Sequence, residues 1–412
     1  MSEASDSDTP ESAEATLPAP ISETFDALDN TLAESGPEAA IDLLVQSLDS
    51  RGEFRALLDA LLLKARHEVG LPLVQVGGFP EVPEPLREKY EEKYVAAIRL
   101  VGGKLLASGD IAGAFPYFRA IAEPEPVTKA IEAYRPENDD RLTQVVEVAF
   151  NQGAHPRKGF ELILNHYGTC SAITAFEHLP RDESTRNACA DMLITQVHEH
   201  LAASLRAEIT HRGQPLPPEG TPIPALLDGR EWLFVDDAYH MDVSHLSSTV
   251  RISPLANDPK TLALAAELTE YGRKLSGRHR YEGDPPFEDV YEDHRVYLRA
   301  LLGHDQDAAV THFRAKLAPE TGEADPGDTV AAQVLVGLLS KIGRLDEAID
   351  LASLTLAGLP ESALFCPGVS QLCQRAGKPE KLAQIARDQD DLVNYTAAIL
   401  QVERRRNGTP PA

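Results

Sequence analysis

Residues 102–126 read GGKLLASGDIAGAFPYFRAIAEPEP, and this stretch decides the fold. Gly109 and Asp110 form a turn signal in its middle, and Ala114 lies in the amphipathic run that follows. A glycine between two helices supplies a residue with left-handed backbone angles, and the later alanine lets the second helix lie close against the first. The stretch therefore predicts two antiparallel helices joined by a glycine turn.

The same glycine turn signal recurs along the chain, each time with a small or apolar residue a few positions later. It is found at Gly36, Gly109, Gly153, Gly303, Gly343 and Gly377. The last two of these glycines are 34 residues apart, a period typical of helical repeats. Apolar residues recur at helical steps in many windows, whereas the alternation typical of strands is scarce. The sequence predicts an all-α fold, an α-solenoid of antiparallel helix pairs with proline-rich interruptions.

Two units resemble the tetratricopeptide-repeat family. The family's glycine, glycine, alanine, aromatic and proline positions are matched in order by Gly102, Gly109, Ala114, Phe118 and Pro126. A second unit keeps Gly343, Ala348 and Pro360 and departs at Val336 and Ala352. The resemblance implies a related solenoid and does not carry a ligand over to this chain. The lysine and asparagine clamp of its chaperone-binding members has no match here, and a helical-hairpin array without true repeats is an alternative.

Proline-rich segments divide the predicted array at residues 71–86 and 213–229. Prolines remove backbone donors and break helices, so a domain boundary is expected at the second segment. Residues 1–20 carry five acids and no base, a composition typical of disorder. The expected organisation is a disordered tail at 1–20, a helical half at 21–212, a linker at 213–230, a second helical half at 231–403 and a tail at 404–412.

Composition narrows the class of protein. Hydrophobic residues make up 42% and charged residues 25% of the 412 residues, as in ordinary globular proteins. The chain has 39 Lys and Arg against 65 Asp and Glu, a net charge of −26 that repels nucleic acids and anionic membranes.

No apolar run suggests a signal peptide or a membrane span, so a cytoplasmic protein is expected. Four cysteines without a CxxC pair indicate neither a disulfide framework nor a zinc ribbon, and no cofactor is expected.

Residues 236–251, DDAYHMDVSHLSSTVR, form the densest polar cluster. His240, Asp242 and His245 are ligand types suited to a divalent metal. On a continuous helix the two histidines would project about 140° apart, so a site would need further ligands such as His294 or His200. A polar helix face is the favoured interpretation. His198 and His200 lie on nearly opposite sides of their predicted helix, so one is expected to contact a neighbour and the other to face water.

A basic concentration at residues 273–280 suggests an anion-binding site. Its members are Arg273, Lys274, Arg278, His279 and Arg280. The alternative is helix termination, with cations in the last turn of a helix from about Lys260 and Gly277 as its stop, and this alternative is favoured.

The leading hypothesis is a non-enzymatic scaffold for a protein or peptide partner, since helical-repeat arrays leave broad surfaces free. The alternatives are a metal-dependent enzyme or metal-binding protein that uses residues 236–251, and a structural subunit of a larger assembly. No phosphate-binding loop, nucleophile elbow or dinucleotide fingerprint is present in the sequence. The sequence does not indicate an oligomeric state.

Overall fold

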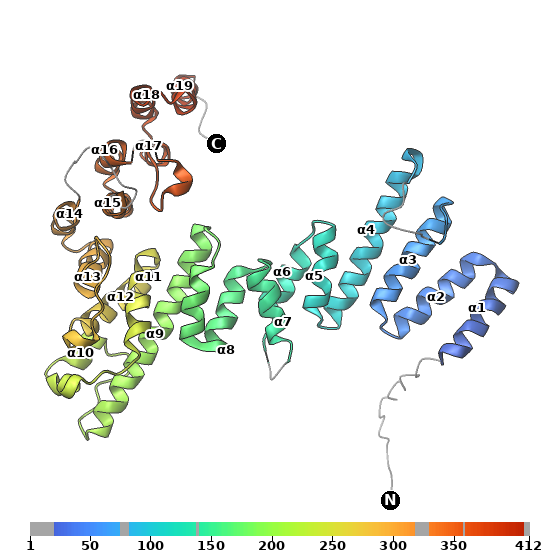
Figure 1. Ribbon diagram of the computed structural model, residues 1–412, viewed down its shortest axis with the longest axis horizontal. Coiled ribbons are helices and arrows are strands. Elements are labelled where there is room, and N and C mark those ends of the chain that lie inside the picture. Colours follow the sequence, from blue (N-terminus) through green and yellow to red (C-terminus); the bar gives the residue numbers. More distant parts are fainter. Residues whose placement is uncertain (1–19, 75–81, 137–139, 318–328, 357–358, 408–412) are drawn as a thin grey trace, which may run out of the picture. The chain divides into compact units, whose positions relative to one another are not determined.

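The computed structural model describes residues 20–74, 82–136, 140–317, 329–356 and 359–407 (Figure 1). All regular structure in these residues is helical, apart from one isolated bridge between Glu282 and Asp289, so the predicted all-α class is confirmed. Within the same ranges, no helix combines the length and the apolar character that crossing a membrane requires. The predicted tail at residues 1–20 lies outside the described residues except for Pro20, which directly precedes the first helix.

The chain divides into two compact units, residues 1–159 and 160–412. The helices of the first unit are α1 (Ile21–Ser35), α2 (Pro37–Ser50), α3 (Phe54–Val69), α4 (Glu84–Ala107), α5 (Ile111–Ala120), α6 (Glu125–Ala133), α7 (Leu142–Val146) and a π-helical turn, η1 (Glu147–Asn151). From α1 to α6, each helix packs against the next one along the chain. The core of this unit therefore consists mainly of contacts between helices that follow one another in the sequence.

The stretch at residues 102–126 forms the contact between α4 and α5. A side-chain carbon at Gly102 would lie 2.8 Å from the Phe118 ring, so only glycine lets the two helices approach this closely. Ala114 has no exposed surface. Gly109 has φ +80°, and the Asp110 carboxylate accepts a hydrogen bond from the Gly113 amide at 2.7 Å, which caps α5. All six glycines predicted to form turns between helices have positive φ.

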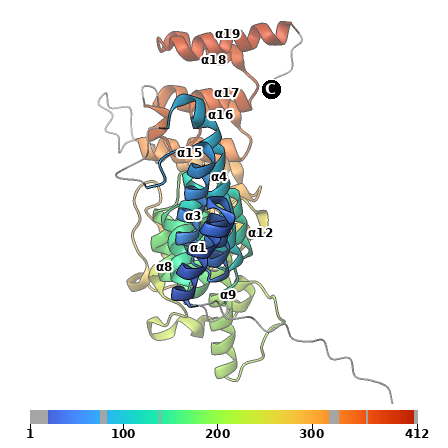
Figure 2. The same cartoon turned by 90° about the vertical axis from the view of Figure 1, so that its right-hand side faces the viewer.

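The second unit begins inside α8 (Pro156–Glu177), which is kinked at Gly168. Its further α-helices are α9 (Glu183–His211), α10 (Ile223–Leu227), α11 (Val243–Ile252), α12 (Pro259–Gly272), α13 (Val290–Leu301), α14 (Gln306–Arg314), α15 (Thr329–Lys341), α16 (Leu345–Thr355), α17 (Val369–Arg375), α18 (Pro379–Asp388) and α19 (Leu392–Arg406). Short 3₁₀ turns are η2 (Glu231–Asp237), η3 (Ser253–Leu255), η4 (Gly277–His279) and η6 (Glu361–Ala363). From α12 to α19 each helix again packs against the next, and α18 and α19 lie side by side (Figure 2).

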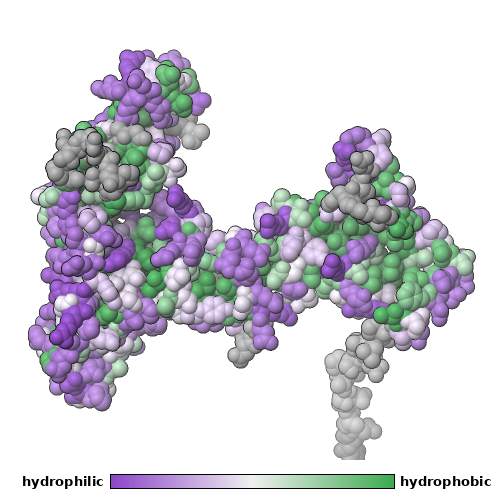
Figure 3. All heavy atoms as spheres, in the orientation of Figure 1, coloured by the Kyte–Doolittle hydropathy of each residue, from purple (hydrophilic) through white to green (hydrophobic). Residues whose placement is uncertain are grey.

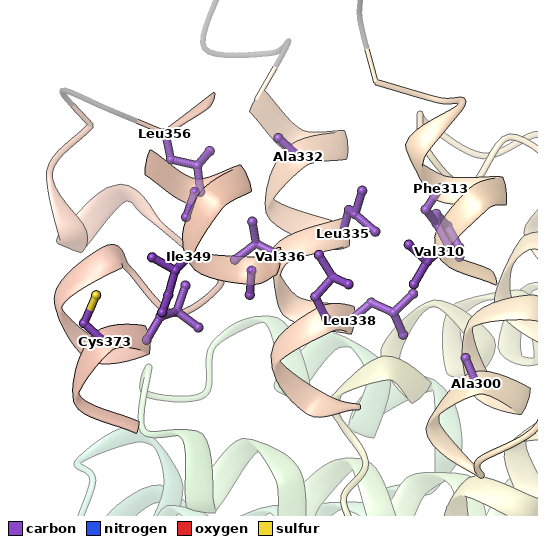
Figure 4. Close-up of a cluster of buried hydrophobic side chains, with 14 of the residues drawn as sticks. Ala300, Val310, Phe313, Ala332, Leu335, Val336, Leu338, Ile349, Leu356 and Cys373 are labelled. Atoms are coloured by element: carbon purple, nitrogen blue, oxygen red, sulfur yellow. The ribbon is translucent and has the colours of Figure 1, made fainter. Parts of the chain in front are cut away.

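A continuous apolar core joins α13 to α18 in the second unit. Figure 4 shows Phe313 of α14 and Leu335 of α15 on one side of this core, and Ile349 of α16 on the other. Val336 and Ala348, which belong to the second repeat-like unit of the sequence, are fully buried in it. A small residue at 348 again accompanies close packing of two successive helices, α15 and α16.

The proline-rich segment at 213–230 differs from the expected linker, because it is packed inside the second unit. The Arg206 guanidinium of α9 donates hydrogen bonds to the carbonyl oxygens of Pro217 and Pro218, both at 3.0 Å. The Glu267 carboxylate of α12 accepts the Ile223 amide at 2.7 Å and binds His198 Nε2 at 2.8 Å. Ile223, Leu226 and Leu227 of α10 are buried. Side-chain acceptors and donors thus satisfy a backbone that forms little regular structure.

The C-terminal boundary also differs from the expected one. Arg404, Arg405 and Arg406 form the last turn of α19, whereas the prediction placed them in a tail at 404–412. Arg405 donates a hydrogen bond to the Gly377 carbonyl at 2.8 Å, and cations at a helix C-terminus interact favourably with its dipole. Residues 408–412 of that predicted tail lie outside the described residues.

The packing at α4 and α5 leads to a stability prediction. Replacing Ala114 by leucine inserts three carbon atoms where no exposed space remains, so Ala114→Leu is expected to lower the free energy of unfolding by about 1 to 3 kcal/mol. The control is Ala120→Leu, the same change at an exposed position of the same helix, with an expected effect within about 0.5 kcal/mol. Urea unfolding followed by circular dichroism measures both. Equal midpoints for the two variants would contradict the packing described.

Candidate functional site

The residues of the predicted metal cluster have separate structural roles. Asp242 is the N-cap of α11, and its carboxylate accepts the Ser244 amide at 2.8 Å and the His245 amide at 3.4 Å. Hydrogen bonds from the Ser244 side chain and backbone lower the pKa of Asp242. The carboxylate is therefore a helix cap with its acceptors directed at the backbone.

His240 lies outside the helix on which the sequence interpretation placed it. Asp236 and Asp237 have positive φ, and α11 begins only at Val243. The Tyr271 hydroxyl accepts a hydrogen bond from the His240 amide at 2.8 Å and lies 3.1 Å from His240 Nδ1, while burial lowers the pKa of His240. The angle of about 140° expected on one helix is thus wrong for this pair.

His294 and His200, the two further ligands considered for the predicted metal cluster, do not join it in the structure. His294 is buried in α13, stacks on Phe287 with ring centroids 4.0 Å apart, and has Nδ1 2.6 Å from the Val290 carbonyl oxygen. His200 is exposed, whereas His198 binds Glu267, as the helical geometry predicts for this pair. In the ranges that the structure describes, no group of three or more His, Cys, Asp or Glu side chains is placed to hold a metal ion. His240, Asp242 and His245 therefore do not form a ligand set there.

The basic residues at 273–280 point to different partners. The Arg273 guanidinium binds Glu270 at 2.8 Å and Glu292 at 2.6 Å. The Arg280 guanidinium donates to the Leu275 and Arg273 carbonyl oxygens at 2.9 and 2.5 Å.

The two remaining cations lie at the surface. Arg278 is 84% exposed and lies 3.3 Å from Asp237, and Lys274 is exposed. The predicted stop at Gly277 is wrong, because α12 ends at Gly272, where a side-chain carbon would lie 2.2 Å from the Tyr291 ring. These four cations do not converge on one anion position.

A groove of about 390 Å³ lies in the second unit, where Leu356 and residues 359–370 face α18 and the start of α19. Its apolar lining comes from Leu356, Leu359, Leu382, Ile385 and Ala386. A hollow of about 400 Å³ at the start of α3, at residues 53–59, is instead lined by consecutive turns of one segment. Only the groove has apolar walls contributed by several elements, which is the form that binding sites usually take.

Hydrogen bonds to distant residues hold the loop wall of the groove. Gln333, buried in α15, accepts the Phe365 amide at 2.9 Å through its side-chain oxygen. The Arg181 guanidinium donates to the Ser362 carbonyl at 2.7 Å, and the Ser370 hydroxyl donates to the Glu361 carboxylate. The wall is therefore fixed by the rest of the unit.

The polar rim of the groove is acidic. Glu361 and Asp391 line it together with Ser370, Gln389 and Asn394. Asp391 caps α19, and hydrogen bonds from the Asn394 backbone and side chain lower its pKa, so this carboxylate is charged at neutral pH. A cation bound beside the groove would meet fixed negative charge.

The chemistry of the groove favours binding over catalysis. Cys366 lies within the loop wall without lining the groove, and burial raises the pKa of its thiol to about 12, so the thiol is protonated at neutral pH and a poor nucleophile. Glu361 and Asp391 are engaged by Ser370 and by the α19 backbone. What the arrangement offers is an apolar surface with charged acceptors at its edge.

Comparison with known proteins adds no relative to this description. No protein-family model matches the chain, and neither a curated protein nor a solved structure matches it. The tetratricopeptide resemblance at residues 102–126 and 336–360 therefore stays a prediction that rests on those residues.

His294 leads to a prediction about pH. Burial is the main cause that lowers its pKa from 6.5 to about 4 in the folded chain, with Arg251 acting in the same direction and the Val290 carbonyl and Asp293 opposing it. Because the unfolded chain takes up the proton first as pH falls, the contribution of neutral His294 to stability is present above about pH 6.5 and is lost progressively toward pH 4. The loss is on the order of 3 kcal/mol.

The measurement is urea unfolding of wild type and His294→Phe across this pH range. The phenylalanine keeps an aromatic ring against Phe287 and does not titrate. Wild type should lose stability relative to His294→Phe as pH falls, whereas His200→Phe at an exposed position should follow wild type. Parallel curves for wild type and His294→Phe would show that His294 is not held neutral.

Proposed function

We propose that this chain is a non-enzymatic scaffold that binds a peptide segment of a partner protein in the groove of the second unit. Its stacked helices are proposed to form a tetratricopeptide-like α-solenoid of antiparallel pairs, located in the cytoplasm. The packing of each helix on the next from α1 to α6 and from α12 to α19 supports the repeat architecture. The groove supports the binding role and is the observation that carries the proposal.

The size and lining of the groove fit apolar side chains of a peptide. Leu356, Leu382 and Ala386 are nearly completely buried and form its floor, and Leu359 and Ile385 are half-buried at its sides. A volume of about 390 Å³ accommodates a few side chains and is too small for a folded domain. Burial of the peptide's own apolar side chains and of the exposed parts of Leu359 and Ile385 would contribute to the affinity, at roughly 25 cal/mol per Å² before the cost of ordering the peptide.

The acidic rim selects the charge of the ligand. Glu361 and Asp391 lie at the groove itself, and Asp388 and Asp390 lie in the turn that leads to Asp391. A lysine or arginine next to the apolar residues of the peptide would form ion pairs with these carboxylates. The net charge of −26 attracts such a segment over a longer range.

A displayed library of random peptides, selected on the full chain, tests this function. The enriched peptides are expected to share apolar side chains next to a lysine or arginine. Their affinity is expected to fall about tenfold or more in Gln389→Trp, because the indole occupies part of the groove. Glu361→Lys, which reverses a rim charge, should weaken the basic peptides and leave their uncharged analogues less affected.

The matched control is Gln374→Trp, the same change at an exposed position of α17 that does not line the groove. It should bind the selected peptides as wild type does. Failure to enrich any peptide family, or equal binding by the two tryptophan variants, would refute the groove as the binding site. Circular dichroism of each variant confirms that the helices are retained.

A further inference from the structure

The first described helix exposes an apolar stripe on its outer side. Ile21, Phe25 and Leu32 of α1 are between 52% and 64% exposed. They occupy positions i, i+4 and i+11, which lie along one side of a helix, while α2 covers the opposite side. These three residues define the α1 face. Figure 3 shows apolar residues reaching the surface over this helix and its neighbours.

The last described helix carries a second stripe of this kind. Leu392 and Val393 of α19 are 78% and 79% exposed, and Ile399 and Leu400 are also exposed, while Ala398 is buried. These four exposed residues define the α19 face, and apolar residues are visible over this helix in Figure 3. Apolar faces of this kind on surface helices mark sites of protein association.

Acids predominate around the α1 face. Residues 21–50 contain seven acids and no base, and of the four acids on α1, Asp26 and Asp29 lie nearer the apolar stripe than Glu23 and Glu34, which project to the opposite side. Arg51, the next residue, donates a hydrogen bond to the Thr24 hydroxyl of α1. None of the four forms an ion pair with another described residue. These charges therefore remain available to a basic partner surface.

The basic charges belong to α19. Its last turn is Arg404, Arg405 and Arg406, with Glu403 as the one acid of the helix. Arg405 donates to the Gly377 carbonyl, whereas Arg404 and Arg406 make no hydrogen bond or ion pair with other residues that the structure describes. The α19 face thus ends in exposed cations that a partner surface could contact.

We propose that the α1 face of one copy of this chain packs against the α19 face of a second copy. Each face supplies an apolar stripe; the α19 face begins beside Asp391 and ends in arginines, so the acids of α1 can pair with the arginine end of α19. The acidic residues 1–20 have the same sign of charge as α1, so charge favours α19 of another copy over that segment. Because two different faces meet, the association is head-to-tail and can extend beyond a dimer.

Sedimentation velocity of the full chain tests the association. The weight-average mass of wild type is expected to rise with protein concentration. Arg404→Glu, which reverses one charge of the α19 face, should weaken association about tenfold or more at low salt. A wild-type chain that stays monomeric at every concentration would overturn the proposal.

Two single variants and their mixture then identify the geometry. Phe25→Asp places a charge in the apolar stripe of the α1 face, and Leu400→Asp does the same in the α19 face. Both positions are exposed, so the fold should tolerate these substitutions. Each variant alone is expected to be monomeric, because one of the two required faces is missing from every copy. Mixed together, the intact α19 face of the first and the intact α1 face of the second should form a dimer that grows no further.

The other outcomes exclude head-to-tail association. If Leu400→Asp alone still dimerises, α1 pairs with α1, and if Phe25→Asp alone still dimerises, α19 pairs with α19. A mixture that remains monomeric likewise overturns the proposal. Gln389→Trp, the groove variant, should associate as wild type does, so failure of peptide binding and failure of association are separate results.

Discussion

The packing of each helix against the next one along the chain, from α1 to α6 and from α12 to α19, is the constraint on which most of the structure depends. It requires a stripe of small and apolar residues on each helix, as at Gly102, where the Phe118 ring leaves no room for a side chain. Contacts of this kind are local, so the core grows by addition of neighbours. The same rule leaves the outer sides of α1 and α19 with apolar residues that no further described helix covers.

The large negative charge is compatible with this packing because many acids have local structural roles. Aspartates cap α5, α9, α11, α12, α13 and α19 by accepting backbone hydrogen bonds, and each carboxylate there also interacts favourably with the helix dipole. Other acids pair with the cations of neighbouring helices, as Asp293 does with Lys316 at 2.8 Å. The four acids of α1, which neither cap a helix nor pair with a described cation, remain available to partners.

Local signals in the sequence predicted the helices and their glycine turns, because propensity, periodicity and positive φ are decided within a few residues. They did not predict the groove, which depends on Gln333 and Arg181 holding a loop far away in sequence. The proline-rich segment was misjudged for the same reason, since its partners Arg206 and Glu267 lie outside it. The helical reading of His240 failed because periodicity was extended across the backbone break at Asp236 and Asp237.

Helix α19 has a part in both proposed interactions, and its position determines how they coexist. Asp391 and Asn394 at its start line the groove and flank Leu392 and Val393 of the α19 face, whereas Leu400 lies six residues beyond Asn394 and Arg404 one further turn along. The helix packs mainly on α18, so a peptide that touches both the 359–370 wall and the start of α19 adds a second support to it. Such a peptide would oppose local opening of α19 without covering Leu400. Occupation of the groove should then hold the α19 face in place, so the two interactions are expected to reinforce one another.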